Sequence, residues 1–97
     1  MIKSFQQGGT EDIFNRISSR AARQTCPEQL WPVARRKLDQ LNAVISLESL
    51  RIPPGNRLEA LSGDRAGQHS IRINEQLRIC FHWTDEGPEQ VEIVDYH

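Results

Sequence analysis

The hydrophobic positions in the first half of the chain recur with the period of an α-helix. Between residues 30 and 45 they step by four, four, three and four, which places them on one helix face. They are Leu30, Ala34, Leu38, Leu41 and Ile45. Because a proline is tolerated only in the first turn of a helix, Pro32 marks the start, and we expect regular helix over residues 32–45 after an irregular turn.

A shorter helix is predicted to begin at Thr10. This residue offers a capping hydroxyl, and two acidic residues follow it in the first turn, where negative charge stabilises a helix. Its apolar stripe consists of Ile13, Phe14 and Ile17. Residues 1–5 alternate between apolar and polar and predict a short strand, whereas residues 18–26 are expected to form a polar connector.

The second half of the chain has the period of β-strands. After the Pro-Pro-Gly-Asn turn at residues 53–56, strands are expected over residues 57–61, 68–73, 77–83 and 90–94. Short loops between successive strands indicate antiparallel neighbours. We therefore predict an α+β fold in a single domain over residues 1–97, in which two N-terminal helices pack on one face of a small, mostly antiparallel sheet.

Alternation along the strands separates the two faces of this sheet. The apolar positions, which we expect against the helices, are Ile71, Ile73, Leu77, Ile79, Phe81 and Trp83. The opposite face carries Arg72 on one strand and Arg78, Cys80 and His82 on the next. A single strand arginine is ordinarily a solvated surface group, but two on adjacent strands of an uncovered face predict an anion site. Cys80 is expected to be a filling side chain.

Composition is that of an ordinary soluble globule, with 37% hydrophobic and 26% charged residues. No apolar run approaches the roughly 20 residues that span a bilayer, and no signal-peptide core follows Met1. Cys26 and Cys80 are too few and too far apart for a disulfide framework or a zinc site. We expect a cytoplasmic protein without a metal or other cofactor.

The net charge of −1 hides an asymmetry along the chain. Residues 1–83 hold all twelve Lys and Arg and eight acidic residues, a charge of +4, whereas residues 84–97 hold five acidic residues and no Lys or Arg, a charge of −5. The body can therefore present a basic face to an anionic partner such as RNA while the last hairpin is acidic.

The last expected strand leads into Asp95, Tyr96 and His97. A strand would deliver an acid, a phenol and an imidazole to a fixed place. A terminal carboxylate on His97 would favour the protonated ring, which binds phosphate and donates a proton to a leaving oxygen. The alternative is that these three residues only finish a sheet edge.

Several segments resemble the RelE/ParE superfamily of toxins, and most closely its HigB branch. They are residues 1–5, 56–64 (NRLEALSGD), 67–74 (GQHSIRIN), 76–81 (QLRICF) and 94–97 (VDYH). Their order and spacing make the set specific over essentially the whole length. The resemblance implies the toxin of a type II toxin–antitoxin system, which enters the ribosomal A site and cuts mRNA without a metal. A helix-turn-helix, HigA-like antitoxin would neutralise it and link it indirectly to operator DNA, and no membrane is involved.

The resemblance also implies roles for individual residues. Arg78 would stabilise the transition state, His97 would be the general acid and Glu59 the general base. Tyr96 would stack on a base or orient the phosphate, and Asp95 would orient His97 or an arginine. The alternatives are that Glu59 is an ordinary strand carboxylate paired with an arginine and that Tyr96 is a sheet-edge aromatic.

Two positions depart from the HigB pattern. HigB toxins commonly have His where this chain has Glu59 and Lys where it has Ser62, although a Glu base resembles the YoeB branch. Loss of one preorganised charge costs on the order of 10²–10³ in rate, so moderate potency is expected. Arg57 or Arg65 could take the place of this Lys, and the residues expected to bind RNA are Arg57, Arg65 and Arg72. The rival classes are a ParE-like, non-hydrolytic poison of DNA gyrase and an interaction module with a decayed site.

Overall fold

The computed structural model of the chain describes residues 1–95. As expected, α-helices form the first half of the chain and strands the second half. The helices are α1 (Gly8–Phe14), α2 (Arg20–Thr25) and α3 (Trp31–Ala43), with single 3-10 turns η1 (Glu28–Leu30), η2 (Leu47–Arg51), η3 (Pro54–Asn56) and η4 (Gly63–Arg65). The strands are β1 (Glu59–Ala60), β2 (His69–Arg72), β3 (Leu77–Thr84) and β4 (Gly87–Asp95). They form one antiparallel sheet in the order β1-β2-β3-β4, which confirms the α+β fold.

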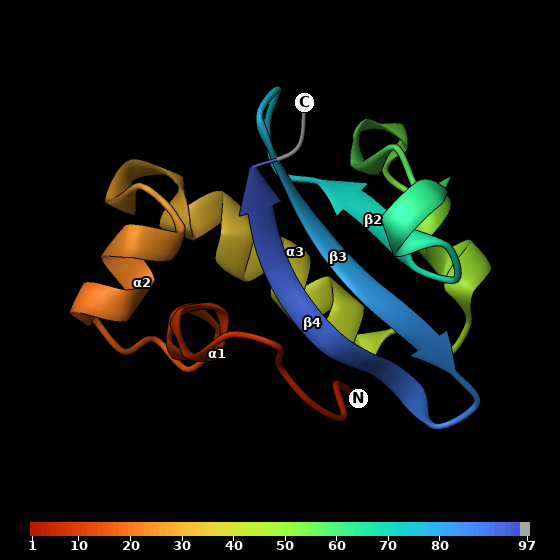
Figure 1. Ribbon diagram of the computed structural model, residues 1–97, viewed down its shortest axis with the longest axis horizontal. Helices are drawn as coiled ribbons and strands as arrows, with labels where there is room; N and C mark the ends of the chain where they lie inside the picture. The colour runs from red at the N-terminus through yellow and green to blue at the C-terminus, as the bar shows by residue number, and fades with distance from the viewer. Residues whose placement is uncertain (96–97) are drawn as a thin grey trace.

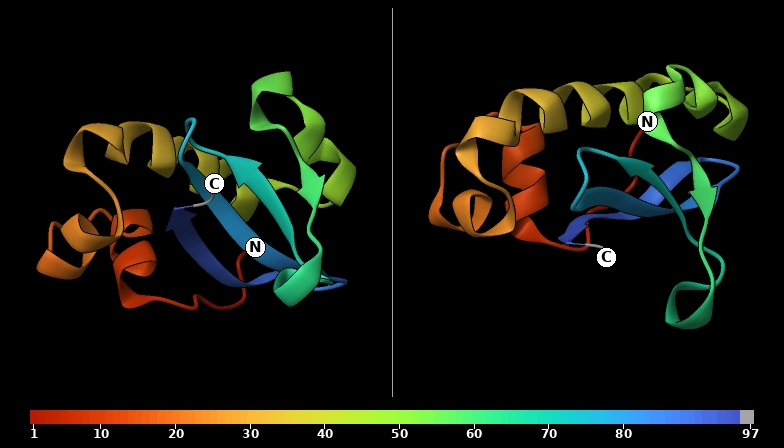
Figure 2. Two further views of the ribbon diagram at one scale, coloured as in Figure 1. Left: turned by 45° about the horizontal axis from the view of Figure 1, so that its top comes forward. Right: turned by 90° about the horizontal axis from the view of Figure 1, so that it is seen from above.

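The elements are arranged in layers around this sheet. Helix α3 crosses one face, while α1 and α2 lie beside the edge strand β4 (Figure 1). Seen from above, the η4 turn stands off the opposite face of the sheet, away from α3 (Figure 2). The face opposite α3 is therefore flanked by the β1–β2 connection, and the expected site residues Glu59, Arg72 and Arg78 lie on that face.

The core lies between α3 and the sheet. Leu38 and Leu41 of α3 are fully buried together with Ile71, Ile79 and Phe81 of the strands, so the predicted strand register is confirmed. Helix α3 begins close to Pro32, after the turn η1, as expected. It ends at Ala43, two residues early, because Val44 is extended.

Ile45 consequently lies beyond the end of α3 and is 96% exposed, so its expected place in the buried stripe was wrong. Ile17 lies beyond the end of α1 and is also exposed. In both cases the helical period of apolar residues continues in the sequence after the backbone has left the helix. The period alone therefore does not show where a helix ends.

The N-terminal segment does not form the expected strand over residues 1–5. It runs along β4 with one parallel bridge between Phe5 and Val91, and Gln6 N donates to Val91 O at 2.9 Å. The pairing of β3 with β4 shifts in register between Cys80 and His82, and nearby Gln90 has φ 54. A bulge of this kind bends the strand edge, so a regular ladder cannot continue along it.

The expected polar connector over residues 18–26 contains α2, which was missed. Ser19 Oγ accepts from Ala22 N at 3.0 Å and caps the helix, and Ala22 is fully buried. Helix α2 packs closely on α1 at Gly9, where a Cβ atom would lie 2.0 Å from Thr25 Oγ1. A helix of six residues is too short to show a hydrophobic period, and small residues carry its packing.

Candidate active site

The candidate site is built on a row of four side chains, one from each strand, on the face opposite α3. Glu59 pairs in register with Ser70, Ser70 with Cys80, and Cys80 with Glu92. The neighbouring row contains Arg72 and Arg78 on β2 and β3. Since successive strand residues point to opposite faces, these side chains lie across the sheet from buried Ile71 and Ile79.

Arg78 is the most constrained member of this face. Its Nε donates to Ser70 Oγ at 2.7 Å and its Nη2 to Arg57 O at 2.6 Å. It is only 8% exposed, so the expectation that Arg78 faces solvent was wrong. The reason is the backbone of Arg57, which lies in the left-handed region (φ 47) after η3 and whose carbonyl covers the guanidinium.

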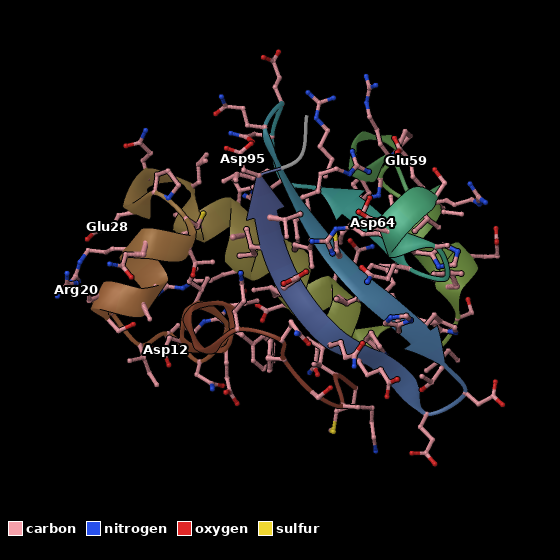
Figure 3. All side chains as sticks on the ribbon, in the orientation of Figure 1. Asp12, Arg20, Glu28, Glu59, Asp64 and Asp95 are labelled. Atoms are coloured by element: carbon pink, nitrogen blue, oxygen red, sulfur yellow. The ribbon has the colours of Figure 1, made fainter. Side chains whose placement is uncertain are left out.

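Glu59 on β1 meets Arg78 of β3 across the intervening strand β2. Its Oε1 lies 3.8 Å from Arg78 Nη2, which is an ion pair without a hydrogen bond, and the Glu59 side chain is 52% exposed. Figure 3 shows Glu59 beside the β1–β2 connection that carries Asp64. The structure thus brings together two of the residues expected in the site, a fixed cation and a half-exposed carboxylate.

A second arginine reaches the same face from η4. Arg65 Nη1 donates to Glu92 Oε1 at 2.8 Å and to Gln68 Oε1 at 3.0 Å. The side chains of Arg65 and Glu92 are 30% and 16% exposed. Glu92 was not among the expected site residues, although the sequence held a signal: it alternates with buried Val91 and Ile93, which places it on the opposite face.

Cys80 lies between these charged pairs and is fully buried. Burial raises the pKa of its thiol, and the charges of Arg65 and Arg78 act in the opposite direction. The thiol therefore stays protonated near neutral pH and is a poor nucleophile. Its position is that of a filling side chain at the centre of the row, as the sequence suggested.

Two other expected residues, Asp95 and Arg72, lie on β4 and β2. Asp95 pairs in register with Leu77, not with a member of the charged row, and lies at the end of β4 (Figure 3). Arg72 is half-buried and its Nε donates to Asn74 O at 3.0 Å. Tyr96 and His97 lie outside the described residues.

A cavity of about 790 Å³ opens beside the site, between α2 and the ends of β3 and β4. Its polar lining includes Gln7, Gln24, Thr25, Arg65, Gln76 and Asp95. Arg65 belongs both to this cavity and to the charged pairs, so the two are continuous. Within residues 1–95 no three His, Cys, Asp or Glu side chains come together as a metal site, and no helix there is long and apolar enough to cross a membrane.

The fold is shared with solved structures of small bacterial toxins. The YoeB–YefM complex from Staphylococcus aureus aligns with a TM-score of 0.53 at 16% identity, over 100% of this chain and 98% of that chain. The YoeB/ParE toxin from Agrobacterium tumefaciens aligns with the same TM-score at 18% identity, over 98% and 99% of the two chains. These likenesses establish the fold.

The family follows from the sequence. Residues 3–97 match the family of HigB-like toxins, described as RelE-like toxins of the type II toxin–antitoxin system HigB. The chain belongs to this family. The resemblance to the HigB branch is thereby confirmed, and with it the class of the protein, a toxin of a type II toxin–antitoxin system.

Individual relatives support this assignment. Toxin HigB-1 of Vibrio cholerae serotype O1 is 52% identical over 50 residues, which are 52% of this chain and 53% of that protein. An uncharacterized protein of Haemophilus influenzae is 40% identical over 55 residues, 57% of this chain and 54% of that protein. The matched part of the chain thus spans about half the length of these curated relatives.

Proposed function

We propose that this toxin is a metal-independent endoribonuclease that cuts mRNA in the ribosomal A site. The observation that carries the proposal is the fixed guanidinium of Arg78, held by Ser70 and by the backbone of Arg57, with the Glu59 carboxylate 3.8 Å away. A carboxylate and a fixed cation are the two groups that activate a ribose hydroxyl and stabilise a phosphorane.

In the proposed reaction the ribose 2′-hydroxyl attacks the adjacent phosphorus. Glu59 accepts the hydroxyl proton, and the new oxygen–phosphorus bond forms as the bond to the 5′-oxygen breaks. His97 donates a proton to that leaving oxygen. The products are a 2′,3′-cyclic phosphate on the upstream fragment and a 5′-hydroxyl on the downstream fragment.

Arg78 acts on the charge that develops in this reaction. Its planar guanidinium keeps its charge at any physiological pH and matches phosphate oxygens in a bidentate way. Because Ser70 and Arg57 already hold it, no reorganisation is needed as the phosphorane forms. A small movement of the half-exposed Glu59 side chain would admit the phosphate beside Arg78.

The other expected residues complete the proposed site. Tyr96 would stack on a base, and Asp95 would orient His97 or an arginine. Arg57, Arg65 and Arg72 would bind the RNA backbone. Ser62 supplies no cation where relatives of the HigB branch carry Lys, so we propose a moderate potency.

The proposed partners follow from the family. A helix-turn-helix, HigA-like antitoxin would neutralise the toxin, and it would link the pair to operator DNA. The YoeB–YefM complex, a solved structure of the same fold, contains a toxin with its partner and supports an antitoxin here. The ribosome and its mRNA are the proposed targets, and the cytoplasm the proposed location.

The test is cleavage mapping on purified ribosomes that carry a defined mRNA. We expect cuts within the A-site codon with the native toxin and none with Arg78→Ala. Arg51→Ala is the matched control, because Arg51 is exposed in η2 and pairs with Glu48, a neighbour in the same turn. Uncut mRNA, combined with loss of supercoiling by purified gyrase, would overturn the proposal in favour of a ParE-like poison.

A further inference from the structure

We propose that Glu92 is a positioning residue, which holds the guanidinium of Arg65 over the sheet as a second phosphate cation beside Arg78. The inference rests on the proposed nuclease function and deepens it. The inference assigns a role to Glu92, which faces the site from β4, at the edge of the sheet opposite to the β1 strand of Glu59. In this role Arg65 supplies the positive charge that Ser62 does not.

The first argument is the distance that the contact bridges. Arg65 belongs to η4, which follows β1 at one edge of the sheet, and Glu92 belongs to β4 at the other edge. Neighbouring strands are about 4.8 Å apart, so about 14 Å of backbone separates the two edges. The side chains nevertheless meet, with Nη1 of Arg65 2.8 Å from Oε1 of Glu92.

The second argument is the low exposure of the pair. Exposed surface ion pairs order long side chains poorly, because screening and side-chain entropy oppose them. Here the side chains are only 30% and 16% exposed, and Gln68 Oε1 accepts a second hydrogen bond from Arg65 Nη1 at 3.0 Å. Two acceptors on one nitrogen leave the planar guanidinium few orientations.

The third argument is the place to which Arg65 is brought. Cys80 pairs in register with Ser70 on one side and with Glu92 on the other, and these two residues are the hydrogen-bond partners of Arg78 and Arg65. The two guanidinium groups therefore act on the same central point of the face. A phosphodiester above Cys80 would meet both cations.

The fourth argument is the origin of Arg65. Ser62 is the residue at the start of η4, and Arg65 closes the same turn three residues later. Arg65 thus delivers its charge from the turn that begins at the uncharged Ser62. The site then has two matched pairs, Glu59 with Arg78 and Glu92 with Arg65, in which Glu59 reacts and Glu92 positions.

A double-mutant cycle on ribosome-bound mRNA tests this role. Glu92→Gln keeps the size of the side chain and removes its charge, and we expect kcat to fall by about tenfold or more, since loss of alignment acts on the reaction step. KM should not rise, because the protein becomes less negative. In an Arg65→Ala background Glu92→Gln should have almost no further effect.

Two further variants separate positioning from a general effect on folding. Glu92→Asp keeps the charge and should recover part of the lost activity. Glu89→Gln, on the same strand, makes the same change of charge at a position opposite His82 and should leave kcat unchanged. Additive effects of Glu92→Gln and Arg65→Ala, or full activity of Glu92→Gln, would overturn the proposal.

A measurement without catalysis keeps this inference distinct from the nuclease proposal. In an NMR spectrum of the whole protein we expect a separate Arg65 Nε–Hε signal that inorganic phosphate shifts. In Glu92→Gln this signal should merge with those of exposed arginines. If the native toxin leaves mRNA uncut, the nuclease proposal fails alone, and this titration decides the role of Glu92: an Arg65 signal unchanged by Glu92→Gln would refute it.

Discussion

Arg78 Nε donates to Ser70 Oγ at 2.7 Å, and both residues are buried on a face of the sheet that none of the α-helices within residues 1–95 covers. The hydrogen bond joins β3 to β2 and fixes a permanent positive charge at the site. Strand alternation alone places these two residues on one face, but it does not show that the segment before β1 closes over them. The structure therefore gives Arg78 two roles, one in the proposed catalysis and one in the fold.

Arg78→Ala is expected to lower both activity and stability. The variant leaves the buried Ser70 hydroxyl and the Arg57 carbonyl without their donor, which costs about 1–3 kcal/mol in the free energy of unfolding. Urea unfolding measures this loss, and mRNA cleavage on ribosomes should fall by at least about 10²-fold. Arg78→Lys, which keeps a charge, serves as control and should unfold closer to the native protein.

Ser62→Lys is expected to raise activity. Ser62 is exposed at the start of η4, so a lysine fits there without disturbing the core. It adds a phosphate cation to the site, and kcat on ribosome-bound mRNA should rise by about tenfold, less than the 10²–10³ attributed to one preorganised charge because an exposed lysine is not held in place. Ser46→Lys, an exposed position before η2, makes the same change of charge and should have no effect. Equal gains in both variants would show a general effect of charge.

Thr10→Val is expected to loosen α1 from the sheet. Thr10 Oγ1 accepts from Ile93 N at 3.1 Å and donates to Gln7 Oε1 at 2.8 Å, in a fully buried position. Valine has nearly the same shape and leaves the β4 amide unsatisfied, at a cost of about 1–3 kcal/mol. For a domain of this size each kcal/mol lowers Tm by about 4–8 °C, which calorimetry detects. An unchanged Tm would contradict the role of this contact.

Alkaline pH is expected to destabilise the fold through Cys26. This thiol is 1% exposed, and burial raises its pKa from the ordinary 9.0 to about 11. Its contribution to stability is fully present below pH 9.0 and is lost as pH rises toward about 11, because the unfolded chain releases the proton first. Urea unfolding at several pH values measures the loss, and Cys26→Ala should flatten the profile in that range.

The sequence predicts those elements of the fold whose hydrophobic residues recur with a regular period. The stripe of Leu38 and Leu41 and the alternation of Ile71, Ile79 and Phe81 specify helix, strands and register, because each residue lies among neighbours of the same pattern. Helix α2 escaped prediction because its six residues carry no stripe. The strand expected at residues 1–5 does not form because of the register shift between β3 and β4. This shift arises from the pairing of two other strands, so the sequence of residues 1–5 does not show it.

In the site, too, some contacts follow from the sequence pattern and others do not. Glu59 on β1 and Arg78 on β3 lie on one face of the sheet, on either side of β2, once the register is known, and the structure brings them to 3.8 Å. The contact between Arg65 and Glu92 joins residues 27 positions apart across the width of the sheet. This contact depends on the path that the backbone takes through η4, which the sequence pattern does not predict. Burial of Arg78 has the same origin, since one carbonyl of a neighbouring segment covers it.

The most direct test of the account replaces a single oxygen in the substrate. The mRNA carries one 2′-deoxynucleotide immediately 5′ to the bond that the native toxin cuts on ribosomes. If the 2′-hydroxyl is the nucleophile that Glu59 activates, cleavage at that bond is abolished, and the unmodified mRNA yields a 2′,3′-cyclic phosphate and a 5′-hydroxyl. Cleavage of the deoxy-substituted bond at an undiminished rate would contradict the proposed chemistry.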